Sequence, residues 1–238
     1  MSATAQTFTA KTDYFGLADS TTLKIESSDE NKSASVAELA DECGDVANYN
    51  VYGEYAAPSC GYALKASLAD KTATLGGLTT VGTGAAARKF MLTQVEIATS
   101  AGQAPTVSAS GVEVGSDVSA GCTCEVTLAA DFLHHAQILF SAFTLEGGKL
   151  QSANYTAGCE PTYAEVEGVR ENADAHGFKI EASLTIAASG STVPALSAGS
   201  GWVITSPLTC SNPNADYPSY TATLTKYLAG TPPSSGNS

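Results

Sequence analysis

Apolar and polar residues alternate along several segments of the chain, which is the pattern of a β-strand with one buried and one solvent-facing side. The clearest case is 178–186, where Phe, Ile, Ala, Leu and Ile occupy every second position between polar residues. The same alternation recurs at 62–68, 122–128 and 220–226. These four segments predict half-buried strands of a mainly β protein.

Two further segments, 90–98 (FMLTQVEIA) and 136–145 (AQILFSAFTL), are apolar on both sides. They predict central strands covered on both faces, although 136–145 also fits a helix. Ser110-Gly111 predicts a hairpin tip between short strands on either side, and Gly147-Gly148 predicts a turn after 144–145.

Helix signals are few. The run Ser35-Val36-Ala37-Glu38 matches a capping box, and Gly44 follows as a stop signal, which predicts a short helix within 33–41. The alternative is an extended or mobile loop, and a second helix could begin near Asp131. We therefore expect a mainly β fold, a β-sandwich or barrel-like domain with one short flanking helix.

The 238 residues are enough to bury a sizeable core, and we expect a single β-rich domain over 1–230. The end of the chain, 231–238 (TPPSSGNS), is a low-complexity tail. An acidic loop insertion is expected near 26–54, which holds eight of the 24 acids against one base, Lys32. The eight acids are Glu26, Asp29, Glu30, Glu38, Asp41, Glu42, Asp45 and Glu54.

The net charge of −13 disfavours binding to phosphate backbones and to anionic membranes. No apolar run approaches the roughly 18 residues of a membrane-spanning helix. The start of the chain lacks the basic and apolar regions of a signal peptide, so we do not expect classical secretion. We therefore expect the six cysteines to be reduced thiols rather than disulfides.

Cys122-Thr123-Cys124 is the first candidate for metal chemistry. The spacing puts both sulfur atoms on one face of a strand, whereas zinc sites usually have longer gaps across a turn. We favour a core-facing thiol pair over a site completed by His134 and His135. His176 is the third histidine, and no serine lies in a nucleophile elbow beside any of the three.

The acidic residues fit no known catalytic or calcium-binding pattern. Asp29 and Asn31 resemble the start of a calcium loop, but Ala34 and Ala40 stand where glycine and glutamate are needed. A single Trp and 8% aromatic residues argue against a glycosidase cleft. A second acidic group reads as a solvated face: Glu160, Glu165, Glu167, Glu171 and Asp174. We therefore predict no catalytic, cofactor-binding or metal-binding residue, and no enzyme.

Several short motifs resemble bacteriophage tail tube and related major tail proteins. They are the run 23–27, the acidic stretch after it, Gly44-Asp45-Val46 and Tyr52-Gly53-Glu54. Trp202-Val203-Ile204 and the closing strand 219–228 are compatible with that organisation.

The resemblance implies a virion structural protein made in the host cytoplasm. Such subunits form rings, commonly hexameric, that stack into a hollow tube, and the genome passes through an acidic bore without specific binding. The implied partners are other copies of the chain and other tail or virion proteins, with no membrane and no small-molecule substrate. On this hypothesis 26–54 is a subunit-contact loop or part of the lumen wall.

Other structural roles share this composition. The alternatives are a capsid decoration protein, a baseplate component or an adhesin-like β-sandwich, and an enzyme is the least favoured class.

Overall fold

The computed structural model describes residues 11–19, 21–40, 43, 46–66, 68–100, 102–130, 142–166, 169–190, 192–210 and 218–233. This part of the chain contains thirteen strands, one 3-10 turn (η1, Gly84–Ala86) and no α-helix. The strands are β1 Leu23–Ala40, β2 Val46–Leu64, β3 Leu68–Leu75, β4 Leu78–Val81, β5 Arg88–Ser100, β6 Thr106–Val114, β7 Cys124–Ala130, β8 Phe143–Glu146, β9 Gly148–Val166, β10 Val169–Ala188, β11 Ala195–Ala198, β12 Val203–Cys210 and β13 Ser219–Tyr227. The expectation of a mainly β fold is confirmed.

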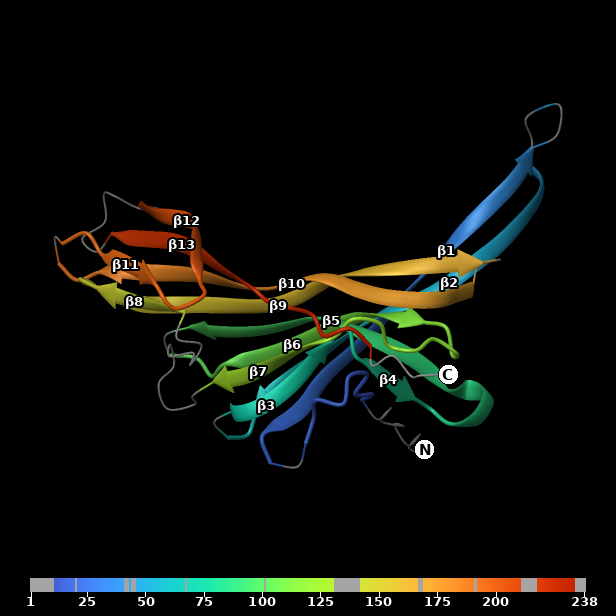
Figure 1. The fold of residues 1–238 in the computed structure, drawn as a ribbon, viewed down its shortest axis with the longest axis horizontal. Helices are drawn as coiled ribbons and strands as arrows, with labels where there is room; N and C mark the ends of the chain where they lie inside the picture. The colour runs from blue at the N-terminus through green and yellow to red at the C-terminus, as the bar shows by residue number, and fades with distance from the viewer. Residues whose placement is uncertain are drawn as a thin grey trace, which may run out of the picture.

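Nine of the strands form one antiparallel sheet (Figure 1). Its order is β1-β2-β6-β5-β9-β10-β13-β12, and β4 pairs with the first half of β5. The other strands form two small antiparallel sheets, β3-β7 and β8-β11.

The core lies on one face of the large sheet. Residues that are register partners on neighbouring strands place their side chains on the same face, so apolar residues line up in rows across the sheet. One buried row consists of Leu224, Ala182, Tyr155, Ile97, Val107 and Tyr62. The β3-β7 sheet packs against this core through Leu75 and Val126, which gives a sandwich-like arrangement of two layers.

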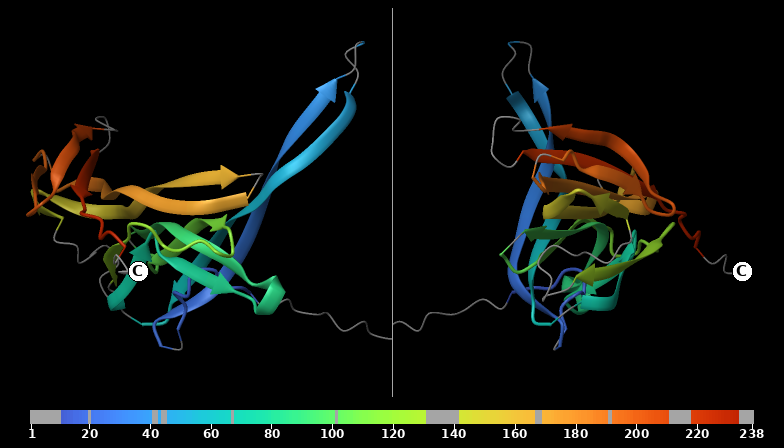
Figure 2. Two further views of the ribbon diagram at one scale, coloured as in Figure 1. Left: turned by 45° about the vertical axis from the view of Figure 1, so that its right-hand side comes forward. Right: turned by 90° about the vertical axis from the view of Figure 1, so that its left-hand side faces the viewer.

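Two hairpins continue beyond the large sheet (Figures 1 and 2). β2 pairs with β6 only over Ser59–Ala63, and past Ser59 it pairs with β1 alone. β9 leaves β5 at Gly158, and β10 leaves β13 at Lys179. We call residues 29–40 with 46–58 the first arm, and residues 160–166 with 169–177 the second arm.

The expected helix within 33–41 and the expected acidic loop over 26–54 are both wrong. Residues 35–40 belong to β1, where Val36, Ala37 and Glu38 pair with residues of β2. Cross-strand hydrogen bonds satisfy this backbone, and a capping pattern only four residues long does not outweigh pairing along a whole strand. The acidic stretch is therefore the greater part of a long hairpin.

The hairpin tip expected at Ser110-Gly111 is also absent. Both residues lie inside the continuous strand β6, opposite Gln94 and Leu92 of β5. A Cβ atom on Gly111 would lie 2.1 Å from the carbonyl oxygen of Met91 and 2.7 Å from the Phe15 ring. The glycine therefore permits a close approach of two layers rather than a turn.

Other strand predictions are confirmed. The segments 178–186, 220–226 and 90–98 lie within β10, β13 and β5, and Gly147 makes a turn between β8 and β9 with φ at 69°. The expected cover on both faces of 90–98 is not found, because Gln94, Glu96 and Ala98 are only partly buried. Segment 62–68 is divided between the end of β2 and the start of β3. The helix considered near Asp131, most of 136–145 and the last five residues of the tail lie outside the described residues.

Candidate functional site

The outer half of the first arm exposes apolar side chains. Val36 is 53% exposed, Leu39 is 67% exposed and Val46 is 53% exposed. Glu26, Asp29 and Glu38 are also exposed on this hairpin. A two-stranded hairpin without a covering layer has little stability of its own, so this arm is suited to contact with another surface.

The base of the first arm is held by an ion cluster. Arg88 of β5 donates from Nε and Nη2 to the two carboxylate oxygens of Glu113 of β6, both at 2.6 Å. Its Nη1 donates to Glu30 of β1 at 2.8 Å, and Tyr14 donates to the other oxygen of Glu30 at 2.8 Å. The Ala56 N–H of β2 donates to Glu113 at 2.8 Å. The cluster thus joins β1, β2, β5 and β6.

Arg170 connects the second arm to the same place. Its guanidinium lies between two aromatic rings, 4.0 Å from the centre of Tyr55 and 4.1 Å from that of Tyr163. It donates to the backbone oxygen of Glu113 at 2.6 Å and to the carboxylate of Glu165 at 3.0 Å. The Arg170 backbone N–H donates to the Tyr55 hydroxyl. Both arginines of the chain therefore contact Glu113.

The pKa values of the two carboxyl groups in this cluster favour the ion pairs. Burial raises the pKa of the Glu113 carboxyl, but hydrogen bonds from Arg88 and Ala56 outweigh this, and the pKa lies below its usual value. Glu30 shows the same balance, with burial opposed by Tyr14 and Arg88, and its pKa is also lowered. Burial and the hydrogen bond to Glu30 raise the pKa of Tyr14 to about 12. Glu30 and Glu113 are therefore ionised at neutral pH.

Among the described residues, β1 and β12 lie at the two ends of the strand order of the large sheet, and each pairs with another strand on one side only. β12 is irregular, with register shifts after Ile204 and Ser206, and it contains Pro207. Val203 of β12 is 54% exposed. Open strand edges present unpaired N–H and C=O groups that can pair with another chain.

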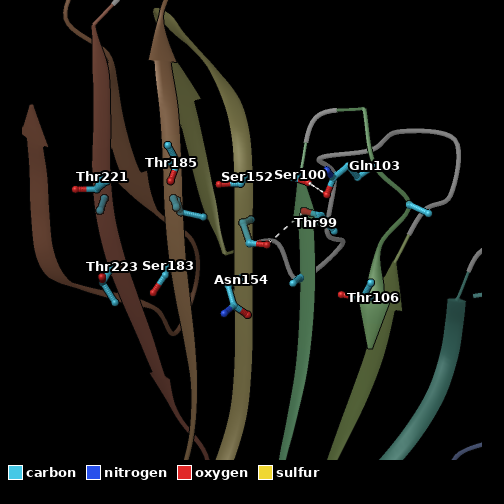
Figure 3. Close-up of a pocket in the computed structure, with 15 residues that line it drawn as sticks. Thr99, Ser100, Gln103, Thr106, Ser152, Asn154, Ser183, Thr185, Thr221 and Thr223 are labelled. Carbon is cyan, nitrogen blue, oxygen red and sulfur yellow. Dashed lines mark hydrogen bonds between the residues drawn. The ribbon is translucent and has the colours of Figure 1, made fainter. Parts of the chain in front are cut away.

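The other face of the large sheet is rich in hydroxyl groups (Figure 3). A groove of about 560 Å³ lies over β5, β9, β10 and β13, beside the β5–β6 turn. Its hydroxyl and amide residues are Thr99, Ser100, Gln103, Thr106, Ser152, Asn154, Ser183, Thr185, Thr221 and Thr223. No charged side chain lines the groove among the described residues. The surface therefore offers no base to a phosphate group.

Asn154 is the most constrained of these residues. Its Nδ2 donates to Glu96 at 2.7 Å, and its Oδ1 is buried without a hydrogen-bond partner among the described residues.

The cysteine pair faces the core only in part. Cys124 is buried in line with Val126 and Leu128, as expected, whereas Cys122 is half exposed. Burial raises the pKa of both thiols, which suits inert thiols rather than metal ligands. The described cysteines, which are all six of the chain, form no disulfide bond. His134 and His135 lie outside the described residues.

The second acidic group is divided along the second arm. Glu165 pairs with Arg170, Glu160 lies 3.4 Å from His176, and Asp174 accepts the Cys122 N–H at 2.6 Å. Glu171 is exposed, and Glu167 lies outside the described residues. These acids thus serve separate local contacts and do not converge on one site.

Within the described residues, no three His, Cys, Asp or Glu side chains are grouped so that they could hold a metal ion. The same part of the chain contains no helix long and apolar enough to cross a membrane.

Sequence reasoning missed the Arg88–Glu113–Arg170 cluster. The one available signal was the scarcity of arginine, since a chain with only two arginines can be expected to use them at particular places.

Comparison with models of known protein families gives no match, and comparison with curated protein sequences gives no significant match. The function must therefore be argued from the arms, the edges and the charge of this chain.

Proposed function

We propose that this protein is a virion structural subunit that assembles with copies of itself into rings, and that the rings stack as a phage tail tube. The observation that carries the proposal is the combination of a nine-stranded sheet with two open edges and a projecting arm with exposed apolar side chains. The sheet edges leave backbone hydrogen-bonding groups unpaired, and the arm leaves apolar side chains exposed. Other copies of the same chain can pair with these edges and cover these side chains.

The two edges differ, so a contact from β1 of one copy to β12 of the next is a head-to-tail contact. Head-to-tail contacts generate closed rings when the rotation between copies closes, and open filaments when it does not. A ring-forming subunit needs such a contact, and the arm that projects from the sheet supplies a second contact for stacking.

The charge of the chain suits passage of a nucleic acid without binding. The net charge is −13, and the two arginines are engaged in the ion cluster, with side-chain exposures of 32% and 16%. Lysine and arginine contacts with phosphate provide most of the affinity for nucleic acids. A bore formed from such subunits would be acidic and would repel the duplex.

Electron microscopy and sedimentation of the purified protein over a range of concentrations test this proposal. We expect rings or tubes, and a strictly monomeric species at high concentration would contradict it. Rigid binding to a preformed shell without self-assembly would favour a capsid decoration protein instead.

A shortened arm sharpens the test. Ser35 and Tyr52 are register partners, so residues 36–51 can be replaced by Asn-Gly, which forms a two-residue hairpin turn. We expect this variant to fold and to lose assembly. Val193→Lys is the matched control, because Val193 is 65% exposed but lies outside the arms and the edge strands. Assembly that survives the shortening would remove the arm from the proposal.

A further inference from the structure

Glu113 of the large sheet makes contacts with both arms. Its carboxylate binds Arg88 and the Ala56 N–H, and its backbone oxygen binds Arg170. Ala56 belongs to the first arm and Arg170 to the second arm, whereas Arg88 and Glu113 lie on β5 and β6. The contacts therefore bring together residues of four strands, β2, β5, β6 and β10.

Tyr55 of the first arm contacts the second arm directly. Tyr55 stacks on Arg170, and its register partner on β1 is Ser33. The register of β1 and β2 shifts between Ser33 and Ser35, directly above this pair. A β-bulge of this kind interrupts the ladder of hydrogen bonds and bends the strand. Beyond Ser33, the β1 side chains whose burial the structure describes, at 34, 36, 38 and 39, are all exposed.

We infer that the Arg88–Glu113–Arg170 cluster is a latch that sets the direction of the first arm, and that the irregularity at 33–35 is the hinge above it. With the latch closed, the base of the arm is fixed against the sheet and the second arm. With the latch open, the base of the arm keeps only weaker anchors, which include the pairing of β2 with β6 and the Tyr14–Glu30 hydrogen bond. A fixed arm lowers the ordering cost of contact with a partner, which is the advantage of preorganisation.

The latch is a property of the single subunit, whereas its effect on assembly rests on the proposed function. Two substitutions weaken the latch at different contacts. Glu113→Gln removes the charge that pairs with Arg88, and Arg170→Lys keeps a charge but loses the planar fork that stacks between Tyr55 and Tyr163. Glu181→Gln is the matched control, because Glu181 forms an exposed pair with Lys179 on the sheet, away from the latch.

Hydrogen–deuterium exchange of the full chain, at concentrations too low for assembly, tests the latch. In both latch variants we expect amide exchange in 29–33 and 54–57 to rise by about tenfold or more, with exchange in 94–98 of β5, in 180–186 of β10 and in β13 unchanged. The Glu181→Gln control should match the unaltered protein. Unchanged exchange in the arm, or an equal rise throughout the chain in both variants, would overturn the inference.

Assembly assays on the same variants separate the two proposals. We expect an opened latch to raise the concentration needed for assembly by about tenfold, because the arm must then be ordered on contact. If rings form and arm exchange does not respond to either variant, the latch is wrong and the proposed function stands. If arm exchange responds but no assembly occurs at any concentration, the latch stands and the proposed function is wrong.

Discussion

The two long hairpins have strands of nearly equal length, yet one lies against the body of the protein and the other projects from it (Figure 2). In the second arm, Ala173 and Ala175 are 6% and 1% exposed. In the first arm, Val36 and Leu39 are more than half exposed.

The difference follows from the size of the residues and from how closely the backbone of each arm can approach the body of the protein. Gly115 and Gly121 lie under the second arm, where a Cβ atom would come within 2.3 Å of the Arg170 backbone oxygen and of an Asp174 carboxylate oxygen, respectively. Small residues on both sides let this arm pack closely. In the outer part of the first arm, the described side chains of Val36, Leu39 and Val46 remain more than half exposed. Pairing of two strands is thus enough to form an arm, whereas packing against the body also requires a complementary surface beneath the arm.

The largest expected effect is a charge placed in the packed arm. Ala175→Asp would bury a carboxylate close to Gly76, and we expect the free energy of unfolding to fall by about 3 kcal/mol or more. Ala34→Asp in the exposed first arm should change it by less than about 0.5 kcal/mol. Urea unfolding of both variants measures this difference, and equal losses would contradict the contrast between the arms.

The next effect depends on pH. We expect Glu113→Gln to lower the free energy of unfolding by about 2 kcal/mol at pH 7, through loss of hydrogen bonds to a charged partner. Because the pKa of Glu113 is lowered in the folded state, this stabilisation is present above the ordinary carboxyl pKa of about 4.3 and is lost as pH falls through the folded value. Urea unfolding at pH 7 and pH 3 should therefore show the two proteins converging in acid. A constant difference would exclude ionised Glu113 as its source.

A smaller effect is expected where the arms meet. Tyr163→Leu keeps apolar area but removes one ring from the guanidinium of Arg170, and we expect a loss of about 1 kcal/mol. Thermal unfolding measures it, with Arg170→Ala as the background in which Tyr163→Leu should cost less. Equal costs in both backgrounds would show that the ring and the guanidinium are not coupled.

The smallest effect on stability is expected at the outer end of the first arm. Leu39→Lys should change the free energy of unfolding by less than about 0.5 kcal/mol, because the side chain is already exposed. The same change should weaken assembly if copies cover this arm. A large loss of stability in the isolated subunit would mean that Leu39 has a partner within the chain.

The strands of the core could be predicted because apolar and polar residues alternate along each of them. Ile180, Ala182 and Leu184 are buried at every second position of β10, as their spacing indicates. The first arm could not be predicted this way, since none of the described side chains at 29–34, 36, 38 and 39 of β1 is buried and its acids suggest a loop. Its structure depends on pairing with β2, which contributes hydrogen bonds rather than a hydrophobic pattern.

The cluster at the base of the arms was beyond sequence reasoning for a different reason. Arg88 and Glu113 are 25 residues apart, and Arg170 and Tyr55 are 115 residues apart. No spacing rule for helices, hairpins or short motifs covers such distances. Only the order of the strands brings these residues together, and that order is a property of the whole fold.

The irregular backbone of the edge strand β12 limits its pairing with strands of other proteins. Pro207 has no N–H, and the two register shifts interrupt the spacing of the remaining donors and acceptors. A foreign β-strand would find only a short regular stretch on β12, which disfavours amyloid-like growth from this edge at high concentration. A neighbour can pair along this whole edge only if its own strand carries matching interruptions.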